Sequence, residues 1–382
     1  MTDLRYAVRA LALSLSLTAV GAFGVGASSP AHAAGTEPVG GAQLAAPGVI
    51  VNLGPGVPAP PAMPGASFLV ADMDTGQILA ARAPHVRHLP ASTLKALTAL
   101  TLIPRLDASR QVMVRPEDVA VEGSHVGVLA GTSYSVRSLM QGLLMASGND
   151  AAYALAGANG GVAGTLAQMN ATATSLGALD TVARDPSGLD KPGQSSSVYD
   201  LALIGRAAMK LPDFRGYVAT KRVAFPGGRS SEGKKVRGFQ VNNHNRLLFN
   251  YEGAVGIKNG YTVAAQQTFI AAATRGGKTY ILTQMASPNG SWRPTAALLN
   301  WAFAHGAAAT PIGRLVEPSA PSRPEHASAG RVSPPQAAAS APLPSLPLPS
   351  MPSWPGVAGL IGALALVGAF LARRRTISRR RR

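Results

Sequence analysis

The chain has 382 residues, of which 46% are hydrophobic but only 5% aromatic, so it can form one large domain or two ordinary ones with a core mainly of Ala, Leu and Val. It contains no cysteine, which excludes disulfides, thiol catalysis and cysteine-ligated metal sites, and it has no HExxH or nucleotide-binding glycine motif. The net charge is +17, but nine of the 35 basic and one of the 18 acidic residues lie in the first and last ten positions, which leaves a moderate +9 between them. That excess suits anionic polymers or lipid head groups as well as nucleic acid.

The N-terminal residues 1–33 have the pattern of a secretory signal peptide. Arg5 and Arg9 precede an apolar run over residues 10–27, and Ala31–Ala33 has the small-x-small pattern of a cleavage site. An uncleaved membrane anchor is the alternative. Because the run is short and rich in small residues, we expect cleavage and export.

The next segments, in chain order, predict an α+β fold. Residues 34–65 are rich in Pro, Gly and Ala without a clear period, which predicts a flexible lead-in. A strand over 67–72, a turn at Asp74–Gly76 and a strand over 77–82 predict a hairpin. Further helices are predicted over 136–145, 151–158, 164–176 (all rich in small or apolar residues), 197–209 and 294–305, and strands over 254–257, 268–273 and 279–283. Helices enclosed between an early hairpin and a late meander indicate one antiparallel sheet built from both ends of the domain, with a helical subdomain.

A buried helix is predicted directly after the hairpin, and it carries the first candidate catalytic pair. Pro90 suits a helix start, Pro104 ends the segment, and the apolar spacing between them fits a largely buried helix. Ser92 lies in the first turn and Lys95 follows three residues later on the same face. Burial lowers the pKa of a lysine, so this pair predicts a serine nucleophile with its own base.

Ser-x-x-Lys is a weak motif by itself, because the chain contains a second copy at Ser231–Lys234. That copy lies in a stretch of Gly, Ser and Lys, which predicts a solvated loop. The Ser92 copy is favoured by its helical setting.

The C-terminal part predicts a membrane anchor. Residues 311–355 form a Pro- and Ala-rich linker, which we expect to be extended. Residues 356–372 are apolar and uncharged, and Trp354 and the arginine-rich tail at 373–382 flank them. These flanks favour a transmembrane helix with the tail in the cytoplasm and residues 66–310, the main domain, outside; a core helix is the alternative.

Two further motifs follow the Ser92 pair in a fixed order. Ser147-Gly-Asn149 lies at a predicted helix-to-loop junction, and Lys258-Asn259-Gly260 lies in a predicted strand. Ser-x-x-Lys, Ser-x-Asn and Lys-x-Gly in this order are typical of penicillin-interacting serine enzymes. A second Ser-x-Asn match at Ser287–Asn289 comes after Lys258 and therefore out of order.

With the stretches around these motifs, residues 67–305 closely resemble the low-molecular-weight D-alanyl-D-alanine carboxypeptidases, the penicillin-binding proteins of the serine peptidase S11 type. The stretches that carry the resemblance are LPASTLK (89–95), LMASGNDA (144–151), DPSGL (185–189), HNRLL (244–248) and GIKNGYT (256–262). The resemblance implies a β-lactamase/D,D-peptidase-like fold. It implies removal of the terminal D-alanine from peptidoglycan stem peptides that end in D-Ala-D-Ala, with β-lactams as covalent inhibitors. It implies no cofactor, metal or nucleic-acid partner.

The resemblance also implies roles for single residues. Ser92 matches the nucleophile and Lys95 its base, while Ser147 and Asn149 match the residues that relay the proton and position the substrate. Lys258 matches the strand lysine that attracts the substrate carboxylate and helps to keep Lys95 neutral. The backbone N–H groups of Ser92 and Tyr261 match the oxyanion hole, and Gly260 allows close approach of the substrate.

Asn259 departs from the family pattern, which has Thr or Ser at this position to help hold the terminal carboxylate. An amide can still donate hydrogen bonds, and Thr262 is nearby in the sequence. The alternatives are a class A-like β-lactamase, disfavoured because neither Glu232 nor Glu252 has the Glu-x-x-Leu-Asn setting, and an inactive membrane-anchored wall-binding protein. Carboxypeptidase, endopeptidase and transpeptidase activities would use the same residues.

Overall fold

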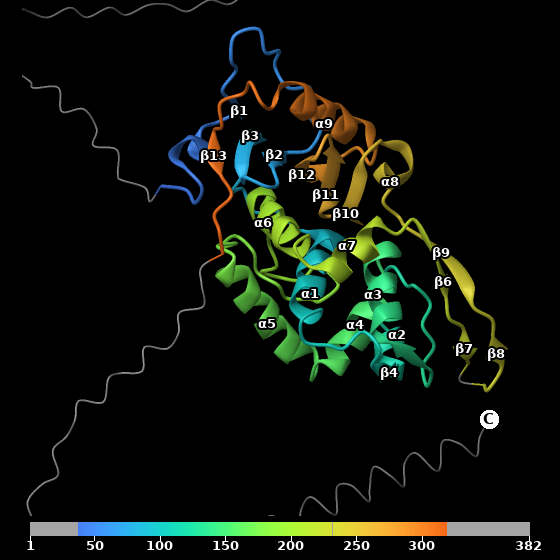
Figure 1. Ribbon diagram of the computed structural model, residues 1–382. Coiled ribbons are helices and arrows are strands. Elements are labelled where there is room, and N and C mark those ends of the chain that lie inside the picture. Colours follow the sequence, from blue (N-terminus) through green and yellow to red (C-terminus); the bar gives the residue numbers. More distant parts are fainter. Residues whose placement is uncertain (1–36, 231, 319–382) are drawn as a thin grey trace, which may run out of the picture. The chain divides into compact units, whose positions relative to one another are not determined.

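The computed structural model describes residues 37–230 and 232–318 (Figure 1). The predicted signal peptide at 1–33, the apolar segment at 356–372 and the tail at 373–382 lie outside these residues, as does most of the linker at 311–355. Within them, no helix is long and apolar enough to cross a membrane.

A seven-stranded antiparallel sheet combines the two ends of the described chain. The early hairpin of β2 (Ser67–Asp72) and β3 (Gln77–Arg82) lies beside the late meander of β10 (Ala254–Thr262), β11 (Gln266–Arg275) and β12 (Lys278–Ser287). The strand order is β1-β3-β2-β12-β11-β10, where β1 is Val49–Val51, and Leu69 pairs with Thr283 where the two halves meet. The predicted hairpin, meander and shared sheet are therefore confirmed.

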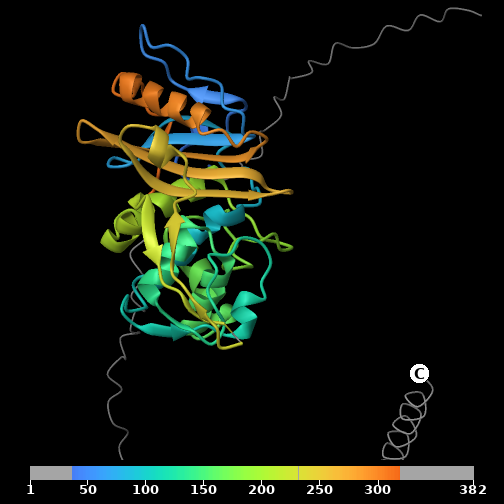
Figure 2. The ribbon, with the colours of Figure 1, turned by 90° about the vertical axis from the view of Figure 1, so that its right-hand side faces the viewer.

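Helices cover both faces of this sheet, which explains why the middle residues of its long strands are almost uniformly buried. Phe68 and Val70 pack on the side of α9 (Arg293–His305), while Leu69 and Ala71 pack against the helical layer. Figure 2 shows α9 on one side of the sheet and the helical layer on the other. A strand buried on both sides loses the polar alternation that would otherwise mark its faces.

The prediction of a flexible lead-in is wrong for the described part of residues 34–65. A short helix, η1 (Ala42–Ala45), is followed by β1 (Val49–Val51), which pairs with β3. The C-terminal side also continues past residue 310, because β13 (Gly313–Arg314) pairs with β3 as well. The strand β13 has no clear pattern of its own, and β1 consists of only three strand-favouring residues, so pairing with β3 stabilises both.

The first helices of the helical layer agree closely with the predicted helices. Its longer helices are α1 (Lys95–Leu102), α3 (Val136–Met145), α4 (Asn149–Ala158), α5 (Val162–Ser175), α6 (Val198–Ala208) and α7 (Pro212–Ala219). The predicted helix over 136–145 matches α3, and the Ser197 side chain caps α6 by accepting from the N–H of Asp200. The helix α7 was not predicted, since it is short and contains Gly216.

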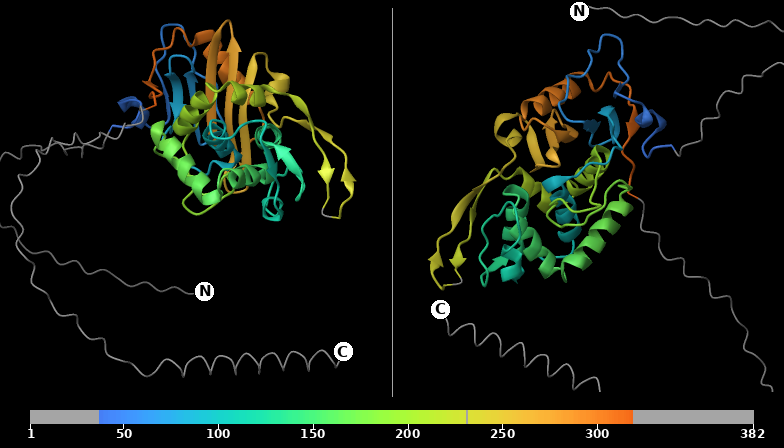
Figure 3. Two further views of the ribbon diagram at one scale, coloured as in Figure 1. Left: turned by 60° about the horizontal axis from the view of Figure 1, so that its bottom comes forward. Right: turned by 180° about the vertical axis from the view of Figure 1, so that it is seen from behind.

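Smaller elements connect these helices. They are β4 (Gln111–Met113), α2 (Pro116–Val119), β5 (Ser133–Ser135) and α8 (Leu247–Asn250). A long hairpin, also not predicted, consists of β6 (Arg222–Phe225), β7 (Gly228–Arg229), β8 (Lys235–Val236) and β9 (Phe239–Asn242). It extends beside the helical layer (Figure 3).

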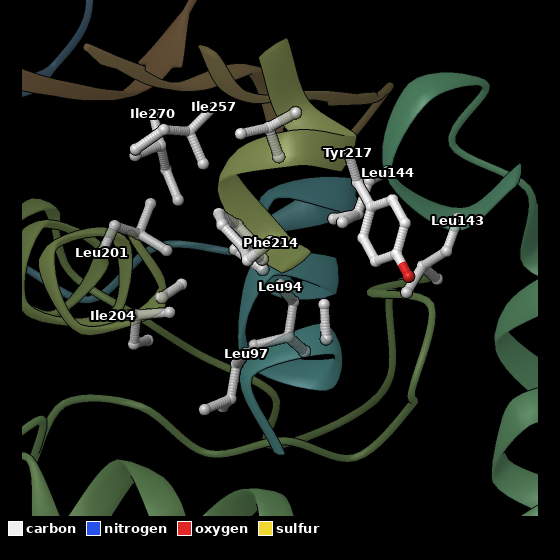
Figure 4. Packing of buried hydrophobic residues seen from close by; sticks show 14 of the residues in the cluster. Leu94, Leu97, Leu143, Leu144, Leu201, Ile204, Phe214, Tyr217, Ile257 and Ile270 are labelled. Atoms are coloured by element: carbon white, nitrogen blue, oxygen red, sulfur yellow. The ribbon is translucent and has the colours of Figure 1, made fainter. Parts of the chain in front are cut away.

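The helix that carries Lys95 lies in the middle of the main core. Figure 4 shows Leu94 and Leu97 surrounded by side chains from three other helices and from the sheet. These neighbours are Leu143, Leu144, Leu201, Ile204, Phe214, Tyr217, Ile257 and Ile270, all buried. Close packing on every side fixes the start of this helix, where Ser92 lies.

Candidate active site

The Ser92 turn is a 3-10 helix, η2 (Ala91–Leu94), that leads directly into α1. The sequence predicts a single helix from Ala91; the tighter first turn differs only in its hydrogen bonds, since the N–H of Lys95 donates to the carbonyls of Ser92 and Thr93. The spacing of three residues brings Lys95 Nζ within 2.8 Å of Ser92 Oγ. The predicted pair is thus in direct contact.

Two glycines hold this turn from opposite sides. A Cβ on Gly188 would lie 2.0 Å from the carbonyl oxygen of Ala91, and a Cβ on Gly260 would lie 2.7 Å from the nitrogen of Ser92. Any larger residue at either position would push the turn away. Ala91 has a φ of 47°, a left-handed backbone that an alanine rarely adopts, so these contacts fix a conformation that would otherwise be unfavourable.

The Lys95 side chain is completely buried and has three polar partners. Its Nζ lies 2.7 Å from Asn149 Oδ1 and 2.6 Å from the Ser187 carbonyl oxygen, besides the Ser92 hydroxyl. Burial lowers the pKa of Lys95 well below its usual value, and the positive charge of Lys258 lowers it further. A neutral amine has two N–H groups for the two carbonyl oxygens, which leaves its lone pair for the Ser92 hydroxyl.

Ser147 and Asn149 lie on the opposite side of Lys95, where α3 ends and α4 begins. Ser147 is nearly buried and has a φ of 61°, a left-handed conformation that is unusual for serine. Asn149 is held by its surroundings, because its Nδ2 donates to the Glu122 carbonyl at 2.6 Å and its backbone N–H donates to the Ser124 carbonyl at 2.7 Å. Its Oδ1 is therefore directed at Lys95.

Asp150, which the sequence analysis did not select, organises the loop behind Asn149. Its Oδ1 accepts from the N–H of Val126 at 3.0 Å and of Ala151 at 2.9 Å. Its Oδ2 accepts from the N–H of Gly127 at 2.8 Å and of Val128 at 3.2 Å. A fully buried carboxylate surrounded by four N–H donors holds residues 122–128 against α4.

The loop over 185–189 completes the surroundings of Lys95. The Asp185 carboxylate accepts from the N–H of Ser187 at 2.7 Å and from the hydroxyl of Tyr153 at 2.7 Å. Burial, followed by the hydrogen bond to Asp185, raises the pKa of Tyr153. These contacts place the Ser187 carbonyl on Lys95. The sequence analysis used this loop only as one of the stretches that resemble the family. It could not predict the role of the Ser187 carbonyl, because every residue type has the same backbone carbonyl.

Lys258 lies on β10 and is also completely buried. Burial lowers its pKa to about 7, and its Nζ donates to the Asn259 carbonyl at 2.8 Å. Near neutral pH, its amine is therefore charged only part of the time. Its positive charge acts on two neighbours, since it contributes, after burial, to the lowered pKa of both Lys95 and His244.

The other predicted substrate-binding residues follow Lys258 along the same strand. Asn259 lines a cavity of about 220 Å³ together with Arg246, Gln267 and Trp292. The Tyr261 side chain is 59% exposed. The Thr262 hydroxyl donates to Asp190 Oδ1 at 3.1 Å and accepts from the N–H of Ala265, so it braces the end of the strand rather than facing Asn259.

The second Ser-x-x-Lys copy and the second Ser-x-Asn match have no contact with the candidate catalytic residues among the hydrogen bonds and ion pairs of the described chain. In the solvated loop, Lys234 is exposed and pairs with Glu232 at 2.9 Å. Ser287 ends β12, and its hydroxyl donates to the Asn289 carbonyl. Among the described residues, no group of three or more His, Cys, Asp or Glu side chains could hold a metal ion.

Comparisons with known proteins agree with this arrangement. Residues 56–289 match the family model of the D-alanyl-D-alanine carboxypeptidases. The chain is 44% identical over 248 residues to D-alanyl-D-alanine carboxypeptidase DacB2 of Mycobacterium tuberculosis, covering 63% of this chain and 83% of that protein. It is 34% identical over 246 residues to the D-alanyl-D-alanine carboxypeptidase of a Streptomyces species, covering 60% of this chain and 84% of that protein.

Solved structures give the same result. A crystal structure of a D-alanyl-D-alanine carboxypeptidase from Mycobacterium tuberculosis superposes with a TM-score of 0.64 at 41% identity, over 69% of this chain and 99% of that chain. The Streptomyces K15 DD-transpeptidase superposes with a TM-score of 0.61 at 30% identity, over 65% of this chain and 100% of that chain. The predicted D,D-peptidase fold of the domain is thus confirmed. The chain belongs to the D-alanyl-D-alanine carboxypeptidase family and is a serine-type hydrolase of that class.

Proposed function

We propose that Ser92 is the nucleophile of a D-Ala-D-Ala carboxypeptidase and that Lys95 is its base. The observation that carries this proposal is the set of partners around Lys95 Nζ: two carbonyl oxygens that only accept, and one hydroxyl at 2.8 Å. A neutral amine in this setting takes the proton of Ser92 as the hydroxyl attacks the carbonyl between the two D-alanines. An ester on Ser92 forms, and the terminal D-alanine leaves after its nitrogen receives a proton.

The remaining roles follow from the positions of the groups. The N–H groups of Ser92 and Tyr261 form the oxyanion hole, since Gly260 brings the strand against the Ser92 turn. Asn149 orients Lys95 and the substrate, and Ser147 relays the proton to the leaving amine. No hydrogen bond joins the Ser147 hydroxyl to Lys95 among the described residues, so this relay would form with substrate bound.

Recognition of the substrate carboxylate is assigned to the end of β10. Lys258 supplies positive charge, and Asn259 donates from its amide where the family has a hydroxyl. Because the pKa of Lys258 is about 7, a bound carboxylate would favour its charged form. Thr262 contributes indirectly, by holding the end of the strand to Asp190.

Water then releases the acyl group, and this step separates the proposal from a β-lactamase. A class A-like β-lactamase needs a free carboxylate beside the ester, but the Asp185 carboxylate on the corresponding loop is occupied by Ser187 and Tyr153. We therefore expect slow release of penicillin and lasting inhibition.

The location of the enzyme is proposed from sequence. Residues 1–33 would direct export, residues 356–372 would anchor the catalytic domain in the cell membrane, and residues 373–382 would remain in the cytoplasm. Deleting residues 356–382 should release the enzyme from the membrane fraction. Retention of the shortened chain in that fraction would contradict the anchor.

Two measurements on the purified chain test the chemistry. The first is the release of D-alanine from a tripeptide ending in D-Ala-D-Ala, with Ser92→Ala as the inactive control. The second is a time course of intact mass after addition of penicillin, with the adduct mapped by digestion. A lasting adduct on Ser92 supports the proposal, while rapid turnover of penicillin without an adduct indicates a β-lactamase. Neither adduct nor turnover would indicate an inactive wall-binding protein.

A further inference from the structure

We propose that the hairpin of residues 221–230 and 232–242, called the basic arm below, is a docking surface for the carboxylate-bearing stem peptides of polymeric peptidoglycan. This inference rests on the proposed function and adds a second contact with the substrate, away from the scissile bond. The feature that points to it is an exposed positive charge on an element that packs on segments next to the candidate catalytic residues.

The charge of the basic arm is concentrated and almost uncompensated. Its basic residues are all exposed: Lys221, Arg222, Arg229, Lys234, Lys235 and Arg237. Its one acidic residue, Glu232, pairs with Lys234 at 2.9 Å. Within residues 37–230 and 232–318, neither Lys235 nor Arg237 has an acidic group at ion-pair distance. Such a cluster attracts anions through the potential that its charges add up to.

The arm is a packed element rather than a loose loop. Phe225 stacks on Tyr134 with ring centroids 5.8 Å apart, and Phe239 packs on Phe225 at 5.5 Å. Near its tip, the Thr132 hydroxyl donates to the Arg229 carbonyl and accepts from the Arg229 N–H, both at 3.1 Å. The cations are therefore held in a fixed place on the molecule.

The arm contacts segments that lead to the candidate catalytic residues. At its base, the N–H of His244 donates to the Met145 carbonyl at 2.9 Å, two residues before Ser147. Along its length, it packs on residues 126–134, which continue from the loop that holds Asn149. Figure 3 shows the arm extending outward from this part of the helical layer.

The size of the arm indicates what it can reach. From Asn242 to Lys235 the chain runs through about seven extended residues, or roughly 20 Å. An extended tripeptide is only about 10 Å long, so a tripeptide cannot contact both the base and the tip of the arm. Neighbouring stem peptides on the same glycan polymer extend over such distances and carry carboxylates, so the polymer can contact the arm and the site at once. Charge complementarity of this kind mainly raises the rate of association.

The test compares two double variants with the same change in charge, both in the full chain. Lys235→Glu with Arg237→Glu reverses the arm, and Arg105→Glu with Arg110→Glu reverses two exposed residues after α1 as the matched control. The substrates are a soluble D-Ala-D-Ala tripeptide and pentapeptide-rich peptidoglycan freed of phosphate-containing polymers. We expect the arm variant to keep its tripeptide activity and to lose about tenfold in kcat/KM on the polymer at low salt, with the loss shrinking at 0.5 M salt.

Equal loss of activity on both substrates would overturn the proposal, because the arm would then shape the active site itself. Equal loss in the control variant would also overturn it, because the effect would then depend on the total charge and not on the position of the arm. Binding is measured separately by co-sedimentation of the Ser92→Ala chain with the same peptidoglycan and with phosphatidylglycerol vesicles. Arm-dependent binding to the peptidoglycan supports the docking surface even if the chain shows no peptidase activity, which would refute only the proposed function. Arm-dependent binding to the vesicles alone would assign the arm to a lipid surface and overturn the proposal.

Discussion

Asp150 offers the sharpest test of how the fold supports the candidate site. In Asp150→Asn, one carboxylate oxygen becomes an NH₂ group, which cannot accept a hydrogen bond. Each oxygen now serves two backbone N–H groups, so two of the four donors lose their acceptor. An unsatisfied buried donor costs about 1–3 kcal/mol, so the loss of two acceptors should lower the free energy of unfolding by about 2–6 kcal/mol.

The same substitution should lower kcat, because residues 122–128 supply the carbonyls that hold Asn149. We expect a loss of about tenfold or more in D-alanine release, since small displacements of positioning groups are costly in rate. Urea unfolding measures the stability, and the rate of penicillin acylation reports on Ser92 and Lys95 without the hydrolysis step. Asp74→Asn, at an exposed position in the β2–β3 turn, is the control and should change neither quantity. If Asp150→Asn lost stability but kept its kcat, the loop would not position Asn149, and unchanged stability would refute the reasoning altogether.

Three further predictions concern single residues. The first can be measured by kinetics and urea unfolding and concerns Gly260→Ala, which should lower kcat about 100-fold because the added methyl group would displace the Ser92 turn. The control is Gly216→Ala, since nothing lies within 4 Å of a Cβ at that position. This control should keep its activity and stabilise α7 by about 0.5–1 kcal/mol. Lys258→Met should abolish peptidase activity yet stabilise the fold by a few kcal/mol at pH 7, by removing a buried amine. The pKa of Lys258 in the folded chain is about 7, below the usual 10.5, so between these pH values the unfolded chain binds one more proton than the folded chain. The stability gained by Lys258→Met should therefore shrink as the pH rises from 7 to 10.5. A gain in stability that does not depend on pH would contradict the assignment. Asn259→Thr should raise kcat/KM on a D-Ala-D-Ala tripeptide severalfold by restoring a hydroxyl donor, and no rise would mean that the amide already suffices.

The sequence by itself determined the ordered motifs and the main elements around them. Ser92 and Lys95 could be paired in advance, because three residues make almost one turn of any helix and bring the two side chains together. The early hairpin, the late meander and the helix over 136–145 were found from local apolar patterns and turn residues. These features depend on neighbours in the chain, so a single sequence contains the necessary signal.

Only the tertiary structure decided which groups complete the site. The Ser187 carbonyl reaches Lys95 from 92 positions along the chain, and a carbonyl is the same in every residue type. Asp150 collects N–H groups from residues more than 20 positions away, so its sequence neighbours do not reveal its role. The strand β1 and the basic arm were missed because their strands are only two to four residues long, and pairing and packing with other segments stabilise them. Burial by the whole fold, rather than the motif, sets the lowered pKa of Lys95 on which the proposed chemistry depends.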